Sequence, residues 1–341
     1  GKMKGTYVIT GASSGIGLAL AERLAAVPDT HLLLTGRSLD KMEGIASKAI
    51  RPKLHGSSFA DCFSLDLSSF ASIEGFAEAV KKCVAGEGLD VIVGNAGLQD
   101  TQYRTTQEGF EMTWGSNHLG HFYLVRLLLP LFYECTEGKK DAQIIMVSSG
   151  THDPARKTPV PPPKFDKIED IATVPHIRVD PTLPEEDKKA QLAANEKEYN
   201  GLRAYSQSKL CNVFFAYELS RRLQGLCQAG GKGGSRKIYT IAYDPGWIPD
   251  TALMRNSVIR YLVPVLAPII RMTSRMASTT EHTSLWMCKL VTGEVLPVPD
   301  GCYWSVDREE RSSELSYDER LQKELWDMSC RFTRLGEELA V

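Results

Sequence analysis

Short apolar runs alternate with longer stretches of helical periodicity over most of the chain. The runs are rich in β-branched and aromatic residues, as buried strands are. They predict strands at residues 6–10, 31–36, 89–94, 142–147 and 238–243, and a further strand that closes at 64–67. Helical patterns follow residue 17 and recur at 108–133, 199–226, 279–290 and from 317 to about 335. Strands that alternate with helices specify an α/β fold with a doubly wound parallel sheet.

Two segments interrupt this alternation. Residues 151–198 are rich in Pro, Lys, Asp and Glu without sustained periodicity, which is typical of an insertion or lid. Residues 258–276 are apolar with interspersed arginines and two prolines. Four interpretations of this segment stay open: part of the core, a lid over the substrate, a dimer face and an interfacial membrane segment. We expect a single domain over 1–341, with a substrate-binding lid region at 250–300 and a C-terminal strand (301–305) and helix within 301–341.

Composition narrows the class of protein. The 341 residues fit one large α/β domain, and 43% hydrophobic with 24% charged residues is ordinary for a soluble globular protein. A net charge of −2 gives no electrostatic case for a nucleic-acid partner. Eight cysteines without a C-x-x-C pair predict reduced thiols, with no disulfide framework or zinc site. With no signal peptide and no apolar run of about 18 residues, we expect a cytoplasmic or organelle-stromal location.

A glycine-rich turn follows the first predicted strand. Residues 10–17 read TGASSGIG and lead into an Ala- and Leu-rich helical pattern. Glycines let a backbone approach a pyrophosphate, and a helix N-terminus supplies free N–H groups, so this context predicts a dinucleotide site of the Rossmann type. The candidate cofactor-binding residues of the turn are Gly11, Ser13, Ser14, Gly15, Ile16 and Gly17.

The ends of the next strands supply further candidate cofactor contacts. Arg37 and Ser38 follow the second strand, where an NAD site usually has an acidic residue. A guanidinium suits a 2′-phosphate, so we expect NADPH (NADP+) as the cofactor. Asp66 can accept a hydrogen bond from the adenine amino group. The remaining candidates at these strand ends are Leu67, Asn95, Ala96 and Gly97.

Tyr205 and Lys209 form the candidate catalytic pair. Their i,i+4 spacing places them on one face of the predicted helix. A cation so close favours the phenolate, so we expect Lys209 to lower the pKa of Tyr205 and let it transfer a proton near neutral pH. His118 and His121 lie three residues apart on another predicted helix, but no pattern in the sequence supplies a third metal ligand to go with them. We interpret them as packing residues and expect no metal.

In their order along the chain, these motifs resemble the short-chain dehydrogenase/reductase family over about residues 6–255. The resemblance implies that Tyr205 is the general acid of a reduction and that Ser149 holds the reacting oxygen. It also implies that Lys209 binds the nicotinamide ribose and that Asn117 holds a water of the proton relay. Contacts to the cofactor's carboxamide side are implied for Pro245, Gly246, Ile248 and Thr251, although one residue more than usual precedes Thr251.

One group within that family resembles the chain more closely, the light-dependent protochlorophyllide oxidoreductases. EGFEMTWGSNHLGHF at 108–122, AYSQSKLCN at 204–212 and GCYWS at 301–305 carry this similarity. That group has a cysteine directly after Pro-Gly, where this chain has Trp247. Retinol dehydrogenases and carbonyl reductases share part of the pattern and need no such cysteine.

The resemblance therefore implies an NADPH-dependent reductase of ketones or aldehydes, with a bulky hydrophobic substrate that contacts Trp247. Light-dependent reduction of a pigment C=C bond and a cofactor-binding protein without turnover are the alternatives. A small hydrophobic substrate is the expected partner. Peripheral membrane contact through residues 258–276 and a homo-oligomer are further hypotheses.

Overall fold

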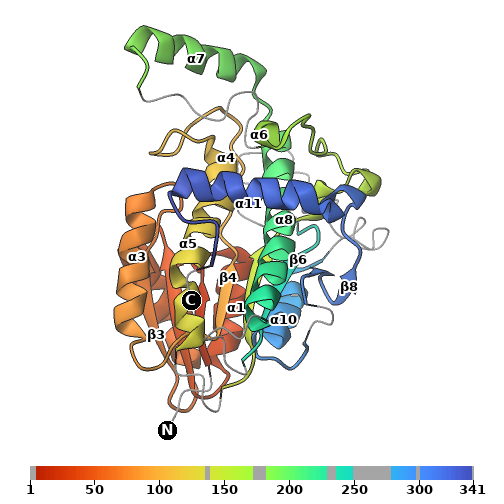
Figure 1. The fold of residues 1–341 in the computed structure, drawn as a ribbon. Coiled ribbons are helices and arrows are strands. Elements are labelled where there is room, and N and C mark those ends of the chain that lie inside the picture. The colour runs from red at the N-terminus through yellow and green to blue at the C-terminus, as the bar shows by residue number, and fades with distance from the viewer. Residues whose placement is uncertain are drawn as a thin grey trace, which may run out of the picture.

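An eight-stranded sheet runs through the molecule. The computed structural model describes residues 5–134, 139–171, 182–228, 236–248, 278–296 and 300–339. The strands of these residues lie in the order β3-β2-β1-β4-β5-β6-β7-β8 (Figure 1), all parallel except β8. Their bounds are β1 Gly5–Ile9, β2 Thr30–Gly36, β3 Phe59–Ser64, β4 Val91–Gly94, β5 Ala142–Val147, β6 Ile238–Asp244, β7 Cys302–Ser305 and β8 Arg308–Glu310. The order runs outward in both directions from β1, so the predicted doubly wound parallel sheet is confirmed.

Helices cover both faces of the sheet (Figure 1). One face carries α3 (Phe70–Cys83), α5 (Gly120–Leu128) and α8 (Gly201–Gln228), with α11 (Glu319–Thr333) packed across α8. The other face carries α1 (Gly15–Ala25), α2 (Leu39–Ile45) and α10 (Thr280–Val291). Because successive strand residues point to opposite faces, a strand covered on both sides reads as a continuous apolar run. This is the pattern by which the sequence predicted these strands.

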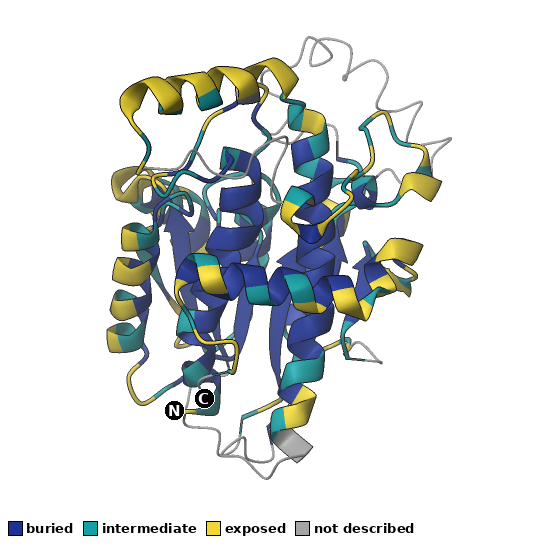
Figure 2. Ribbon diagram, turned by 45° about the horizontal axis from the view of Figure 1, so that its top comes forward, coloured by how far each residue is buried: buried dark blue, intermediate teal, exposed yellow. Residues whose placement is uncertain are grey.

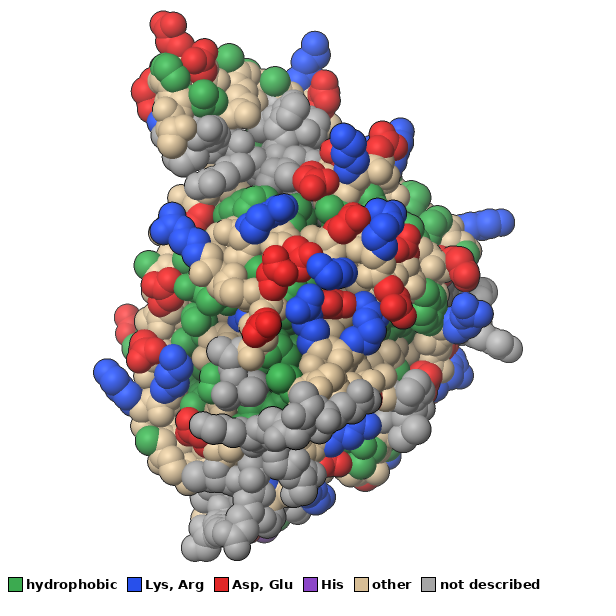
Figure 3. Space-filling view, viewed as in Figure 1, with side chains coloured by type: hydrophobic (Ala, Val, Ile, Leu, Met, Phe, Trp, Pro, Cys, Tyr) green, Lys and Arg blue, Asp and Glu red, His purple; other side chains and the backbone are tan. Residues whose placement is uncertain are grey.

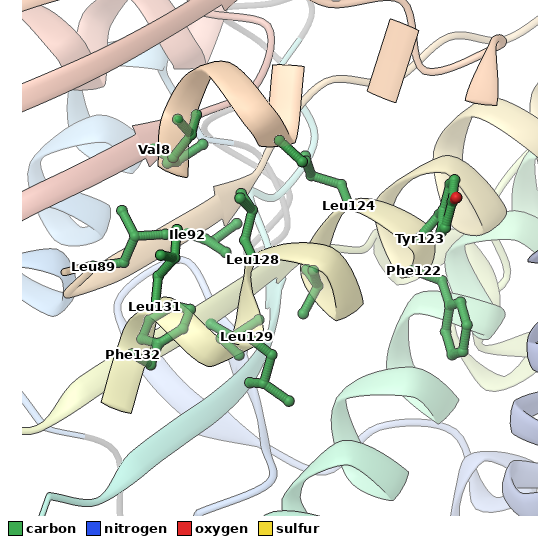
Figure 4. Packing of buried hydrophobic residues seen from close by; sticks show 14 of the residues in the cluster. Val8, Leu89, Ile92, Phe122, Tyr123, Leu124, Leu128, Leu129, Leu131 and Phe132 are labelled. Carbon is green, nitrogen blue, oxygen red and sulfur yellow. The ribbon is translucent and has the colours of Figure 1, made fainter. Parts of the chain in front are cut away.

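The core on the α3 and α5 side shows how this burial is achieved. Val8 of β1 and Ile92 of β4 pack against Leu124 and Leu128 of α5 (Figure 4), and all four are fully buried. Burying a side chain of this size contributes roughly 1.5–3 kcal/mol. The outer helix faces remain exposed (Figure 2), and there acidic and basic side chains are interspersed (Figure 3). This mixture agrees with the small net charge.

The helix predicted at 108–133 is not one regular helix. It consists of α4 (Met112–Trp114), the π-helical segment η3 (Gly115–Leu119), α5 and the 3₁₀ segment η4 (Leu129–Tyr133). Pro130 has no N–H to donate, which suits the change to 3₁₀ geometry at η4. The third strand ends at Ser64, the first residue of the segment 64–67 that was predicted to close it.

The insertion contains more helix than its composition suggested. Its described residues form η5 (Gly150–His152), η6 (Pro154–Arg156), α6 (Ile168–Ile171) and α7 (Glu185–Glu198). Helix α7 is exposed along most of its length (Figure 2). Its first turn holds three acidic residues, which suits a helix N-terminus. Shorter segments elsewhere are η1 (Ala46–Ile50), η2 (Arg51–Lys53) and η9 (Glu314–Tyr317). Among the described residues no helix is long and apolar enough to cross a bilayer. Residues 258–276 lie outside the described residues.

Candidate active site

The carboxyl ends of the parallel strands meet at one edge of the sheet, and the motif residues follow them there. Gly11 comes shortly after β1, Arg37 directly after β2, Asn95 after β4 and Ser148 after β5. Ligands of open α/β sheets bind outside this edge. The fold therefore gathers segments that are far apart in the chain around one site.

The glycine turn between β1 and α1 forms a backbone cradle. Gly11 and Gly15 have φ angles of +68° and +56°, in the left-handed region that favours glycine. A Cβ on Gly17 would lie 2.4 Å from the carbonyl oxygen of Gly11 and 2.5 Å from Nδ2 of Asn95. Helix α1 begins at Gly15, and its N-cap Ser14 makes no side-chain capping hydrogen bond. An uncapped helix start over a glycine turn fits a pyrophosphate.

The side chains predicted to hold the adenosine half lie beside this cradle. Arg37 is exposed, so its guanidinium can reach a ligand. The Ser38 hydroxyl accepts a hydrogen bond from Lys41 N at 3.3 Å and thereby caps α2. Oδ1 of Asp66 accepts hydrogen bonds from the N–H and the hydroxyl of Ser68 at 2.9 and 2.7 Å. One oxygen of this carboxylate is therefore committed to the local turn.

Ser149 and Tyr205 come together at the end of β5. The Ser149 side chain hydrogen-bonds the phenol of Tyr205 and accepts a hydrogen bond from the N–H of Thr151 at 3.3 Å. Ser148, by contrast, is buried and donates its hydroxyl to the carbonyl of Lys209 at 2.8 Å. Ser149 is thus the member of the serine pair that contacts the tyrosine.

Lys209 lies one turn further along α8 and is buried. Its ammonium is 5.5 Å from the centroid of the Tyr205 ring and donates to the carbonyl of Val147 at 3.0 Å. A Cβ on Gly97 would lie 3.5 Å from Lys209 Nζ and 3.6 Å from Oδ1 of Asn117. The segments around Gly97, Asn117 and Lys209 therefore converge on one point.

The pKa of Tyr205 corrects one expectation. Burial raises this pKa to about 12, against the hydrogen bond from Ser149, and the nearby Asp244 carboxylate adds to the rise. The prediction that Lys209 lowers the pKa of Tyr205 is therefore wrong for this structure. Burial lowers the pKa of Lys209 itself to about 8, with Asp244 acting in the opposite direction. The ammonium donates to the Val147 carbonyl, and its effect on the phenolate is weaker than that of burial.

Asn117 lies in the π-helical segment η3, with its side chain fully buried. Its Oδ1 accepts from Leu98 N at 2.8 Å, and its Nδ2 donates to Leu98 O at 2.8 Å and to the Ser208 hydroxyl at 3.0 Å. The amide therefore fixes the turn after Gly97 to α8. Both Nδ2 hydrogens are used. The water of the implied proton relay would therefore bind to Oδ1 or to the main chain of Asn117.

His121 links Asn117 to the cofactor edge, a role that the sequence did not indicate. Its Nδ1 lies 3.0 Å from the carbonyl oxygen of Asn117, and its Nε2 lies 2.9 Å from the Thr10 hydroxyl. The same hydroxyl oxygen accepts from Ala96 N at 2.9 Å. Burial lowers the pKa of His121 to about 4, so the ring stays neutral and can donate at Nδ1 while accepting at Nε2. The histidine is buried, as predicted, but its two ring nitrogens also connect Asn117 to Thr10 through hydrogen bonds.

His152 and Asp244 form a second support that the sequence analysis missed. Nε2 of His152 accepts from the N–H of Ser313 at 3.1 Å, which leaves Nδ1–H to donate to the carbonyl of Ser149 at 2.7 Å. Asp244 receives hydrogen bonds from Tyr303 at 2.9 Å and from Arg156 at 3.1 Å. Ser313, Tyr303 and Arg156 are 59 to 161 residues away from the side chains that they contact, so no local pattern marks these supports.

The segment after β6 reaches the same edge. Gly246 has a φ of +74° and donates its N–H to Asp244 Oδ1 at 3.0 Å. Ile248 is buried and Trp247 half-buried. Thr251 and residues 249–277 lie outside the described residues, as does much of the lid region predicted at 250–300. Of the predicted carboxamide contacts, Pro245, Gly246 and Ile248 are therefore placed here.

Comparisons with known proteins agree with this architecture. A model of the short chain dehydrogenase family matches residues 6–158. Protochlorophyllide reductase, chloroplastic, of Marchantia paleacea is 31% identical over 97% of this chain and 68% of that protein. Human retinol dehydrogenase 13 is 30% identical over 97% of this chain and 85% of that protein.

Solved structures share the fold. An uncharacterised protein from Mycobacterium paratuberculosis superposes with a TM-score of 0.64 at 24% identity, covering 99% of this chain and 96% of that one. An NADPH-bound carbonyl reductase from chicken fatty liver gives a TM-score of 0.57 at 17% identity, covering 91% and 99%. With its sheet, its glycine cradle and relatives similar over nearly its whole length, the chain belongs to the short-chain dehydrogenase/reductase family of oxidoreductases.

Proposed function

We infer that this oxidoreductase uses NADPH to reduce the carbonyl group of a bulky, hydrophobic ketone or aldehyde. The observation that carries this proposal is the hydrogen bond between Ser149 and Tyr205, with Lys209 one turn away. When bound, NADPH supplies the hydride. The residues of this chain supply the proton and hold the reacting oxygen.

The raised pKa of Tyr205 suits reduction. With a pKa of about 12, the phenol keeps its proton at neutral pH. Reduction of a carbonyl creates an alkoxide, which is a stronger base than phenolate, so transfer from Tyr205 to that oxygen is favourable. In this proposal Ser149 donates a hydrogen bond to the same oxygen. In the opposite direction Tyr205 would first have to lose its proton, which its surroundings oppose.

The cradle and Arg37 support NADPH as the cofactor. Gly15 has open space where a Cβ would lie, so a pyrophosphate can approach the backbone at the start of α1. Arg37 is exposed directly after β2, where a cation can pair with a 2′-phosphate. The substrate class follows from the half-buried Trp247 and from the similarity to retinol dehydrogenase.

A dark assay with bulky apolar ketones and aldehydes tests the proposal, with NADPH consumption as the readout. Tyr205→Phe should lower kcat by about 100-fold or more and leave NADPH binding unchanged. Tyr239→Phe, at a half-buried tyrosine of β6, is the matched control and should be active. Tight NADPH binding with no turnover on any substrate would instead support a cofactor-binding protein.

A second candidate is light-dependent reduction of a pigment C=C bond. The similarity to protochlorophyllide reductase over 97% of this chain favours it. Trp247 stands against it, because the resembling group has a cysteine at that position. Paired dark and illuminated reactions with NADPH and protochlorophyllide distinguish the two, since conversion only in the light would replace the carbonyl proposal.

Peripheral membrane contact, a homo-oligomeric state and a cytoplasmic or organelle-stromal location stay predictions. The segment proposed for membrane contact, 258–276, lies outside the described residues. Co-sedimentation with liposomes would support peripheral contact, and recovery in the supernatant would remove it. Gel filtration with light scattering gives the oligomeric state, and cell fractionation decides between cytoplasm and organelle stroma.

A further inference from the structure

A compact cluster of potential metal ligands lies at the opposite end of the sheet from the cofactor edge. His31 is the second residue of β2, Asp61 is in β3, and Cys83 is the last residue of α3. Strand pairing sets Asp61 opposite Leu33, so His31 and Asp61 are near neighbours on the face that α3 covers. Helix α3 returns along that face and brings Cys83 to the early part of these strands. No sequence motif marks the cluster, because its members are 30 and 22 residues apart.

The three ligand atoms converge on one point. His31 Nε2 lies 2.9 Å from Asp61 Oδ2 and 3.8 Å from Cys83 Sγ, and Sγ lies 3.3 Å from Oδ2. Around a tetrahedral Zn²⁺ with normal bond lengths, the same three separations would be about 3.4–3.6 Å. Each separation therefore needs to change by no more than about 0.5 Å. A side-chain adjustment of that size needs no change in the strands or the helix.

A second carboxylate orients the imidazole. Glu87 Oε2 lies 3.1 Å from His31 Nδ1, the nitrogen that points away from the three ligand atoms. Metal-bound histidines usually donate their other N–H to such a group, which fixes the tautomer. Phe59 stacks on the ring at a centroid distance of 4.0 Å and restricts its rotation. The histidine is thus already held as a metal ligand is held.

Access and chemistry point to the kind of ion. His31 is 1% exposed, whereas the Asp61 side chain is 44% exposed, so one side of the cluster is open to solvent. One imidazole, one thiolate and one carboxylate form a mixed N/S/O donor set, which suits Zn²⁺ among the common divalent ions. A water can then fill the fourth position of a tetrahedron.

We propose that His31, Asp61 and Cys83 form a zinc site, with Glu87 as the group that orients His31. Binding displaces the proton of the Cys83 thiol, because the thiolate is the form that binds a metal. The ion joins β2, β3 and the end of α3, three elements that otherwise meet here through hydrogen bonds. The site is separate from the cofactor edge, so it does not depend on the proposed reduction.

Titration of the reduced, tag-free protein with Zn²⁺ against a chromophoric chelator tests the site. We expect one strong equivalent per chain and a higher unfolding temperature with the ion bound. Glu87→Gln should weaken binding about 10- to 100-fold, and Cys83→Ser should weaken it further. Co²⁺ in place of Zn²⁺ should give a thiolate-to-cobalt charge-transfer absorption that Cys83→Ser removes.

Cys62→Ser is the matched control. Cys62 is the next residue along β3, is half-buried, and packs on the opposite face of the sheet. This variant should keep both the zinc equivalent and the cobalt absorption. The proposal is overturned if the wild-type protein takes up no strong equivalent, or if Cys83→Ser binds Zn²⁺ as tightly as wild type. Cys83→Ser changes one half-buried atom, so the test stands even where a His31 variant fails to fold.

Discussion

The ammonium of Lys209 lies 3.0 Å from the carbonyl oxygen of Val147, and this bond holds the lysine at the end of β5. The same carbonyl also accepts from the Asn212 side chain at 3.0 Å. The carbonyl would therefore keep a partner if Lys209 were replaced. The buried ammonium, by contrast, has a pKa lowered to about 8, which means that the fold opposes its charge.

Lys209→Met should stabilise the free protein while removing its activity. Between about pH 8 and 10.5 the unfolded lysine binds a proton that the folded one has lost, so the Lys209 contribution to stability rises with pH across that window. Below pH 8 the folded protein carries the full cost of a buried charge. We expect a gain of up to about 3 kcal/mol at pH 7 in the variant, measured by urea unfolding.

The pH dependence separates this effect from a general change in packing. The advantage of Lys209→Met should shrink as the pH rises from 7 to 9.5, because wild type loses its buried charge. Lys82→Met, at an exposed lysine of α3, should show no such trend. A variant less stable than wild type at pH 7 would contradict the argument.

His152→Gln and His152→Asn should separate two functions of one imidazole. Nδ1 donates to Ser149 O and Nε2 accepts from Ser313 N. An Asn amide can replace Nδ1, whereas a Gln amide reaches the position of Nε2. We expect Asn to keep most of kcat, and Gln to lower kcat about tenfold at an unchanged KM, because Ser149 is then no longer positioned. Each variant should lose about 1–3 kcal/mol of stability from the group left unpaired.

Equal kcat values in the two variants would show that His152 supports the fold without positioning Ser149. His152→Ala, which removes both contacts, sets the lower limit for stability and activity. The kcat and KM values should be taken with the same carbonyl substrate at saturating NADPH.

The sequence predicted the features that local patterns encode. The strands were predicted from apolar runs. The glycine turn and the Tyr205–Lys209 pair each lie within eight residues of sequence, so both are local patterns. The family and the sheet could therefore be predicted, and both are confirmed. The exposed acidic start of α7 escaped notice because a helix without an apolar face has no periodicity to detect.

Features that depend on distant partners could not be predicted. Asn117 is held by Leu98 and Ser208, which are 19 and 91 residues away, and His152 by Ser313, which is 161 residues away. The rise in the Tyr205 pKa has the same origin. Sequence spacing shows that Lys209 is near, but burial and Asp244 decide the sign.

Arg37→Ala should reduce the preference for NADPH over NADH. A surface guanidinium paired with a 2′-phosphate contributes at least about 1.4 kcal/mol, so KM for NADPH should rise about tenfold or more while KM for NADH stays near its wild-type value. Arg311→Ala, at an exposed arginine outside the cofactor edge, is the control. Equal changes for both cofactors would show that Arg37 does not contact the 2′-phosphate.

Alanine at Gly17, Gly15 and Gly44 should have three different effects on stability. In Gly17→Ala the new Cβ would meet the Gly11 carbonyl at 2.4 Å, and a backbone group cannot move cheaply. We expect a loss of about 2–3 kcal/mol, together with weaker NADPH binding. Gly15 has open space but a φ of +56°, so alanine should cost about 1 kcal/mol through backbone strain alone.

Gly44 supplies the opposite case, because it lies inside α2 with nothing within 4 Å of a new Cβ and without a positive φ. Gly44→Ala should therefore stabilise the protein by about 0.5–1 kcal/mol. Urea unfolding of the three variants at one pH gives the ranking directly. If Gly17→Ala were no worse than Gly15→Ala, the close approach of α1 to the Gly11 carbonyl would not be what requires glycine at position 17. The cradle would then be defined by backbone angles alone.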